Sequence, residues 1–202
     1  MGTGAVTEAS DPERFLAVLE RVVDALDRWG RPYAVVGSVA NEVFVEVGPA
    51  EDLDVLVPPD EGEAAIEALR RHGFEPEEPR EDWLRKARRD DVLVDVLVRP
   101  RGGLVLDDAF AGGIRRVRYR GLTIPVPGPE DLLLIACLSA QDETPNHWFT
   151  AARFVRDAGL DWHRLADRAR RLAPLRVASL LLYCRSEGVE VPDGILKSLL
   201  PS

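Results

Sequence analysis

The sequence has few residues that crosslink a chain or hold a soft metal. Its 202 residues include only two cysteines, Cys137 and Cys184, which lie far apart and outside any CxxC spacing. This scarcity excludes a disulfide framework and a cysteine-based zinc site, and it predicts a reducing, cytoplasmic location. The sequence also lacks an apolar run of about 18 residues, the length that crosses a bilayer, and its first residues do not resemble a secretory signal. We therefore expect no membrane partner.

Lysine is scarce as well, because only Lys86 and Lys197 among the 26 basic residues are lysines.

The formal net charge of −9 argues against a protein that coats DNA or another nucleic acid. The charge is uneven, since residues 1–100 hold 23 acids and 12 bases, whereas residues 101–202 hold 12 acids and 14 bases. A site between an acidic and a basic half suits metal cations with a phosphate-bearing ligand. A solvated surface with chance asymmetry explains the counts equally well.

Hydrophobic periodicity divides the chain into two parts. Helical spacing after Asp11, the expected N-cap, predicts a helix that ends near Trp29. Short apolar runs predict strands at residues 33–36, 53–57, 83–88, 92–98, 114–119 and 122–126. From Pro129 onward the pattern is helical. We expect an α/β (α+β) protein with a small mixed-sheet core at residues 1–127 and a C-terminal helical bundle at residues 128–202.

Three aspartates stand where strands normally carry apolar residues. Asp52 and Asp54 share one face of a strand because side chains alternate, and Asp95 is the one charge in the run VLVDVLV. Adjacent carboxylates repel each other unless cations lie between them, and a central strand tolerates an acid only when it is paired, protonated or bound to metal. Such oxygen ligands suit Mg²⁺ or Mn²⁺ better than zinc. A structural pairing of Asp95 with an arginine is the alternative.

Gly37 and Ser38 lie where an apolar strand is expected to turn into a helix. Glycine lets the backbone approach a ligand closely, the amides at a helix start point outward, and a serine hydroxyl can bond a phosphate oxygen. Taken by itself, this pair of residues is explained by an ordinary turn. Together with the three aspartates, in this order, the pair favours a site for a nucleotide held through metal.

These segments resemble a known superfamily. YAVVGSVANEVFV, EDLDVLV and VLVDVLV are similar to the signature of the DNA polymerase β-like nucleotidyltransferases. IPVPGPEDLLLIACL and HWFTAARFVRDAGLDWHRLADRARRL resemble the uncharacterised nucleotidyltransferase family related to the AbiEii-type abortive-infection proteins. The resemblance covers about residues 11–200 and implies a nucleotidyltransferase core that leads into a helical bundle.

The resemblance also implies roles for the motif residues. Asp52, Asp54 and Asp95 would be catalytic and would ligate Mg²⁺ or Mn²⁺, with Asp95 also drawing a proton from the acceptor. Gly37 and Ser38 would hold the β- and γ-phosphates of an NTP. An NMP would pass to a hydroxyl on a small molecule, a tRNA end or a protein, and pyrophosphate would leave.

Two departures from the family pattern support a different interpretation. Residues 47–51 lack the arginine and small hydroxyl residue that many relatives carry before the first acid. Phosphate neutralisation then falls to bases on the middle hairpin: Lys86 and Arg88, followed by Arg85 and Arg89. Relatives also often carry a histidine in the helix after PEDLLL, where this chain has Ile135 and Ser139. The alternative is a catalytically silent binding or antitoxin-like module of the same fold.

Other arginines and aromatics have simpler explanations. The last hairpin carries Arg115, Arg116, Arg118 and Arg120. Their positions fit a solvated edge strand better than a contact with phosphate or RNA. Three further arginines recur at helical spacing: Arg164, Arg168 and Arg171. We expect these on an exposed helix face. Three aromatics at helical offsets are expected in the core: Trp148, Phe149 and Phe154.

Overall fold

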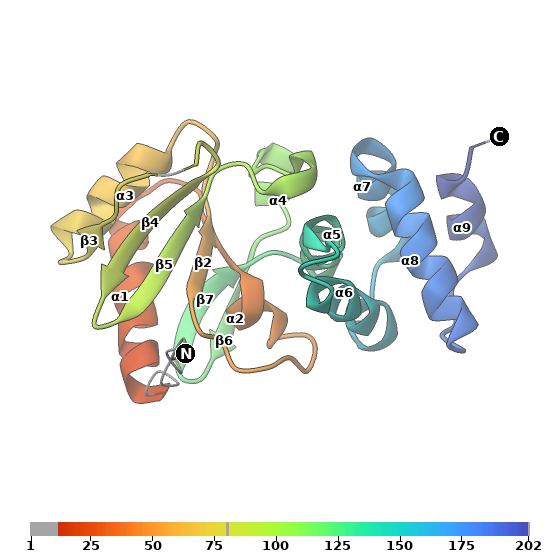
Figure 1. Ribbon diagram of the computed structural model, residues 1–202, viewed down its shortest axis with the longest axis horizontal. Helices are drawn as coiled ribbons and strands as arrows, with labels where there is room; N and C mark the ends of the chain where they lie inside the picture. Colours follow the sequence, from red (N-terminus) through yellow and green to blue (C-terminus); the bar gives the residue numbers. More distant parts are fainter. Residues whose placement is uncertain (1–11, 80, 202) are drawn as a thin grey trace, which may run out of the picture.

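A computed structural model describes residues 12–79 and 81–201, and Figure 1 shows its elements in order along the chain. Within these residues every strand ends by Val126, and the elements after it are helices. This arrangement is the expected α/β (α+β) class, a mixed sheet followed by helices. Asp11, the expected N-cap of the first helix, lies outside the described residues.

The larger sheet has the strand order β1-β2-β5-β4-β3. Its strands are β1 (Ala34–Val36), β2 (Leu53–Leu56), β3 (Glu75–Pro76), β4 (Leu84–Arg89) and β5 (Val92–Leu97). The neighbours β2 and β5 run parallel, whereas the other pairs are antiparallel. Because β2 and β5 are parallel neighbours in the middle of the sheet, residues far apart in the sequence meet there side by side.

Helices cover one face of this sheet. Helix α1 (Pro12–Trp29) packs against α3 (Gly62–Arg71), which also contacts β4 and β5, and α1 passes behind these two strands in Figure 1. Along β5 the residues alternate between buried valines and partly buried side chains, and Asp95 belongs to the partly buried set. The alternation therefore places Asp95 on the opposite face from Val92, Val94 and Val96.

A hairpin of β6 (Arg115–Tyr119) and β7 (Leu122–Val126) forms a second sheet, and β7 lies next to β1. All four arginines of this hairpin are exposed, as expected. Two of them also tie the hairpin to the core, since Arg116 pairs with Asp27 of α1 and Arg120 with Glu42. These ion pairs give the hairpin a structural role.

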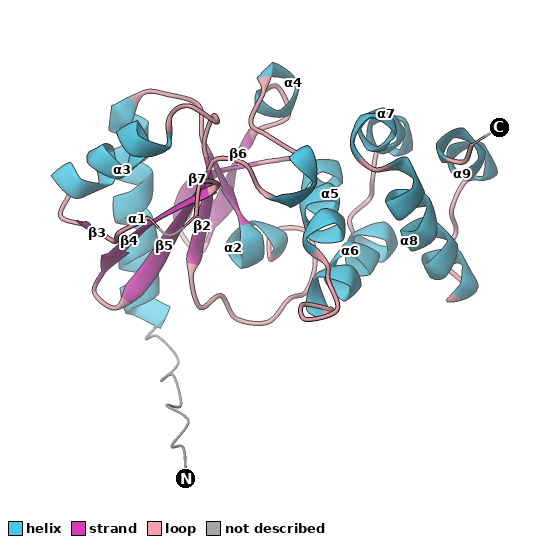
Figure 2. Ribbon diagram, turned by 45° about the horizontal axis from the view of Figure 1, so that its top comes forward, coloured by secondary structure: helices cyan, strands magenta, loops and turns pink. Residues whose placement is uncertain are grey.

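The C-terminal part is built around α5. Two short helices, η1 (Arg101–Gly103) and α4 (Asp108–Ala111), lead from β5 towards the second hairpin. The later helices are α5 (Pro129–Ser139), α6 (Asn146–Asp157), α7 (Trp162–Leu172), α8 (Pro174–Ser186) and α9 (Asp193–Leu199). Helix α5 is buried along most of its length and contacts η1, α6, α7 and α8, so it joins the core to the other helices (Figure 2). Among the described residues, no helix combines the length and apolar character needed to cross a membrane.

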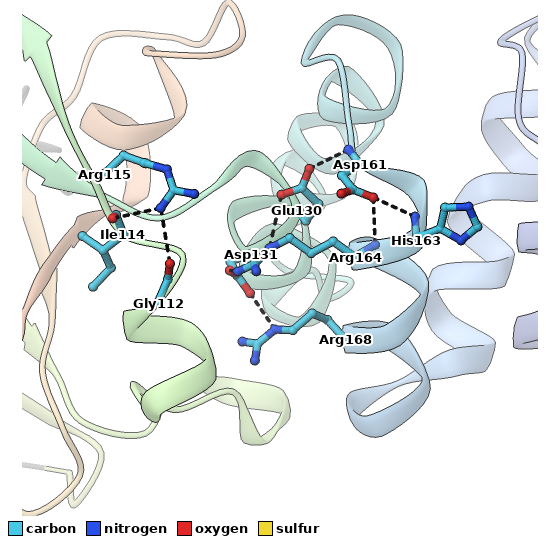
Figure 3. Close-up of polar contacts among 9 residues, drawn as sticks. All are labelled: Gly112, Ile114, Arg115, Glu130, Asp131, Asp161, His163, Arg164 and Arg168. Carbon is cyan, nitrogen blue, oxygen red and sulfur yellow. Dashed lines mark hydrogen bonds and ion pairs between the residues drawn. The ribbon is translucent and has the colours of Figure 1, made fainter.

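An ion-pair network holds the start of α5 against α7. The carboxylate of Asp131 is fully buried, and its two oxygens accept hydrogen bonds from Arg164 Nη2 at 2.7 Å and Arg168 Nε at 2.8 Å. Figure 3 shows both guanidinium groups converging on Asp131 from one face of α7. Nearby, Glu130 accepts a hydrogen bond at 2.7 Å from the backbone N–H of Asp161, the N-cap of α7.

The network corrects one expectation from the sequence. Arg164 and Arg168 lie on the face of α7 that meets α5, not on an exposed face, and the Arg168 side chain is only 13% exposed. Phe149 is a second correction, because it is half exposed rather than in the core. Phe154 is fully buried, as expected. Helical spacing identifies residues that share a face but does not identify what that face contacts.

Candidate active site

The three aspartates converge at the centre of the larger sheet. Asp54 of β2 and Asp95 of β5 are direct neighbours in the parallel register. Asp52 comes two residues before Asp54 and therefore lies on the same side of the strand. One carboxylate oxygen from each residue lies within 4.8 Å of the others. The fold thus brings together the three acids that the sequence pattern singled out.

The cluster carries more negative charge than its surroundings neutralise. Burial, followed by the charges of Asp52 and Asp95, raises the pKa of Asp54 to about 7 despite a smaller lowering effect of Lys86. Burial and the charge of Asp95 likewise raise the pKa of Asp52. Carboxylates held this close in a partly buried site favour protonation or a bound cation. The chemistry of the donor set, three hard oxygen ligands, fits Mg²⁺ or Mn²⁺.

Lys86 contacts this cluster. Its Nζ donates hydrogen bonds to both oxygens of Asp95, at 2.9 and 3.1 Å. Lys86 and Asp95 face each other directly across the antiparallel pair of β4 and β5. Asp95 therefore pairs with a lysine, and not with the arginine considered as the structural alternative.

The turn between β4 and β5 explains this pairing. Asp90 and Asp91, between β4 and β5, both have positive φ, at 49° and 62°. Positive φ at both central residues is typical of the two-residue type I′ hairpin turn. Such a turn pairs Arg89 with Val92, and counting back from that pair places residue 86 opposite residue 95.

Gly37 packs directly against Asp54. Its φ is +64°, a left-handed conformation that favours glycine, and a Cβ built at this position would lie 1.9 Å from Oδ2 of Asp54. Any larger residue would have to move the carboxylate. The pairing of Val36 with Asp54 across β1 and β2 explains the proximity, because the chain turns at the next residue. Glycine at position 37 therefore shapes the acid cluster.

Ser38 lies in the first turn of α2 (Gly37–Asn41) and is partly buried. Its hydroxyl makes no hydrogen bond within the described part of the chain. The N-cap residue Val36 provides no side-chain acceptor for the first amides of the helix. This turn thus offers hydrogen-bond donors next to the carboxylates, as a phosphate site requires, and its role stays a prediction.

The other candidate bases of the middle hairpin have different partners. Arg85 bonds Glu63 at 2.6 Å, and Arg88 bonds Glu77 at 3.2 Å. Arg89 donates to the backbone oxygens of His72 and Gly73. Arg88, which sequence reasoning assigns to nucleotide binding, must leave Glu77 before it can contact a phosphate. Its assignment remains a prediction.

Comparison with known proteins points to one family and one fold. The model of a family described as "uncharacterised nucleotidyltransferase" matches residues 45–187, a range that contains all three aspartates. An antigenic nucleotidyltransferase-like protein from Paracoccidioides brasiliensis has a TM-score of 0.55 and 15% identity, over 93% of this chain and 94% of that chain. The antibiotic-resistance factor ANT(2'')-Ia, in solution, has a TM-score of 0.52 and 17% identity, over 88% of this chain and 95% of that chain. At these identities the likeness establishes the fold. No curated protein matches the chain in sequence.

Proposed function

This chain belongs to the family of uncharacterised nucleotidyltransferases, and on that premise we propose that it transfers a nucleoside monophosphate from an NTP to a hydroxyl acceptor. The acceptor oxygen attacks the α-phosphorus, the bond between the α- and β-phosphates breaks, and pyrophosphate leaves. The observation that carries this proposal is the cluster of Asp52, Asp54 and Asp95, whose ligand oxygens lie within 4.8 Å of one another.

Asp52, Asp54 and Asp95 are the residues that would hold Mg²⁺ or Mn²⁺. Their oxygen donors suit a hard cation, and the raised pKa values of Asp52 and Asp54 support a site that a cation would stabilise. When bound, a divalent cation supplies neutralisation of phosphate charge and polarisation of the reacting oxygens. Positioning and charge neutralisation then account for most of the chemistry.

The remaining roles belong to the chain's own groups. Asp95 would accept the proton of the acceptor hydroxyl, the role that the superfamily resemblance implies for the acid on the later strand. The turn at Gly37 and Ser38 binds the β- and γ-phosphates through its amides and the free serine hydroxyl. Lys86, and Arg88 once released from Glu77, would neutralise phosphate charge.

The acceptor classes are a small molecule, a tRNA end and a protein side chain. We would test a small-molecule hydroxyl first, because ANT(2'')-Ia, which shares the fold, is described as an antibiotic-resistance factor. The net positive charge of residues 101–202, with 14 bases against 12 acids, is small and gives little support to a long polyanionic acceptor.

The test combines binding with turnover. The full chain is incubated with Mg²⁺, each NTP in turn and a panel of hydroxyl acceptors, and pyrophosphate release is measured alongside the melting temperature. We expect at least one NTP to raise the melting temperature in a metal-dependent way and one acceptor to release pyrophosphate. Absence of both effects would contradict the proposal.

A catalytically silent binding module is the second candidate. It is favoured by the engagement of Arg85, Arg88 and Arg89 in other contacts, which leaves few bases for the phosphates. A metal-dependent thermal shift with an NTP, but no pyrophosphate with any acceptor class, would favour this candidate.

A further inference from the structure

Lys86 lies where a cation would bind Asp95. Its ammonium contacts both oxygens of that carboxylate, at 2.9 and 3.1 Å. A metal ion that takes a carboxylate as a bidentate ligand lies in the same position between the two oxygens. Any divalent ion that uses Asp95 must therefore displace the ammonium or share an oxygen with it.

The backbone fixes this arrangement. The tight turn at Asp90 and Asp91 sets the register of the hairpin, and Lys86 and Asp95 are direct cross-strand neighbours. Side chains in such pairs start close together, so the contact does not depend on a long reach. The pair is also partly withdrawn from water, since the side chains of Lys86 and Asp95 are 36% and 14% exposed.

The residue type supports the same conclusion. Only two of the 26 basic residues in the chain are lysines, and one of them stands at this position. A lysine ammonium is a compact point charge with rotatable donors, whereas a guanidinium is a wide planar fork. Of the basic side chains, the ammonium is the closer substitute for a small metal cation.

The net charge of the site indicates when Asp95 becomes available to bind a cation. Three ionised carboxylates and one ammonium sum to −2, which a single divalent cation neutralises. A second divalent cation would give the site a net positive charge, and the phosphates of a nucleotide would compensate it. The same phosphates attract the ammonium of Lys86.

We propose that Lys86 makes the binding of a second divalent cation conditional on nucleotide, an inference that rests on the proposed function. Without nucleotide, Lys86 neutralises Asp95, and the protein binds one cation through Asp52 and Asp54. With nucleotide, the phosphates draw the ammonium away and Asp95 accepts the second cation. Lys86 is thus a positioning residue that acts through Asp95.

The test is a Mn²⁺ titration of the full chain followed by electron paramagnetic resonance. It is run alone and with an ATP analogue that carries a methylene group between the α- and β-phosphates and cannot transfer its NMP. We expect the wild type to bind one Mn²⁺ per chain alone and two with the analogue. We expect Lys86→Met and Lys86→Gln to bind two without the analogue, the second at least about 10-fold more tightly than in the wild type.

Lys197→Met is the matched control, because it removes the other lysine of the chain from an exposed position in α9. It should titrate like the wild type, and a melting curve of each variant checks that it is folded. Wild-type stoichiometry and affinity in both Lys86 variants would overturn the inference and leave the proposed function intact. No binding of Mn²⁺ or the analogue to the wild type would overturn the proposed function and the inference with it.

Discussion

Two groups of carboxylates lie inside this protein, and they are neutralised in different ways. Asp131 is fully buried, and two guanidinium groups bond its oxygens at 2.7 and 2.8 Å. Asp54 shares its site with two other carboxylates, and the one base that contacts the cluster among the described residues bonds Asp95. Burial and these neighbours raise the pKa of Asp54 to about 7. The comparison separates an acid that holds two helices together from acids that favour a bound cation.

We expect the largest effect, a loss of stability, at Asp131, the acid that two guanidinium groups neutralise. Asp131→Asn leaves two guanidinium groups without their shared counter-charge, and breaking a buried ion pair from one side costs about 3–5 kcal/mol. The free energy of unfolding, measured in urea, should fall by that amount. Asp54→Asn is the comparison variant and should not destabilise the protein, because it removes a repelled charge. Equal destabilisation by both substitutions would contradict the distinction between the two groups.

For the rate of the reaction, in contrast to stability, we expect Asp54 to be the sensitive position and Asp131 the insensitive one. Asp54→Asn should lower the rate of pyrophosphate release by about 10²–10³-fold, since it removes one preorganised charge from the reacting centre. Asp131→Asn should retain the rate wherever it remains folded. Asp60→Asn, at an exposed acid just after β2, is the control for a nearby loss of charge. A rate of Asp54→Asn equal to that of the control would refute the catalytic assignment.

Stability should depend on pH through Asp54. Its pKa is about 7 in the folded protein but about 4 in an unfolded chain. Between these values the folded state holds a proton that the unfolded state has lost, so stability falls as the pH rises from about 4 to about 7. The loss should be of the order of a few kcal/mol.

Unfolding free energies at pH 5 and pH 8 check this prediction. Asp54→Asn should lose much less stability over that interval than the wild type. Added Mg²⁺ should stabilise the wild type more at pH 8 than at pH 5, because the ionised carboxylates bind it. A pH dependence that is identical in the wild type and in Asp54→Asn would contradict the shifted pKa.

The smallest effect concerns the shape of the site. Gly37→Ala must move Asp54, because the new Cβ would lie 1.9 Å from its oxygen. Gly159→Ala is a close control, with φ at +62° and no atom within 4 Å of the new Cβ. Each variant should lose about 1–2 kcal/mol of stability from backbone strain, and Gly37→Ala alone should weaken Mn²⁺ binding, by about 10-fold. Equal Mn²⁺ affinity in the two variants would show that Gly37 does not shape the cluster.

The sequence predicted the acid cluster well because its signals are local. Alternation along a strand places Asp52 and Asp54 on one side, and a single charge in an apolar run marks Asp95 as unusual. The order of strands and helices was also predictable from hydrophobic spacing. Three expectations stay predictions. They are the division near residue 127, the cytoplasmic location, and nucleotide binding by Gly37, Ser38, Lys86 and Arg88.

The Asp131 network was not predictable in the same way. An acid in the first turn of a helix is common at exposed positions, because it interacts favourably with the helix dipole. Arginines at helical spacing likewise occur on both exposed and buried faces. Only the packing of α5 against α7 decides that Asp131, Arg164 and Arg168 meet. The helical spacing of the two arginines therefore does not show which acid they bind.

The most direct test of the central claim is an anomalous difference map from a crystal soaked with Mn²⁺ and an NTP analogue that cannot transfer its NMP. The account predicts a manganese peak between Asp52, Asp54 and Asp95, with the triphosphate at the turn of Gly37 and Ser38. A crystal that binds the nucleotide elsewhere, or that binds it with no manganese at the three carboxylates, would contradict the account.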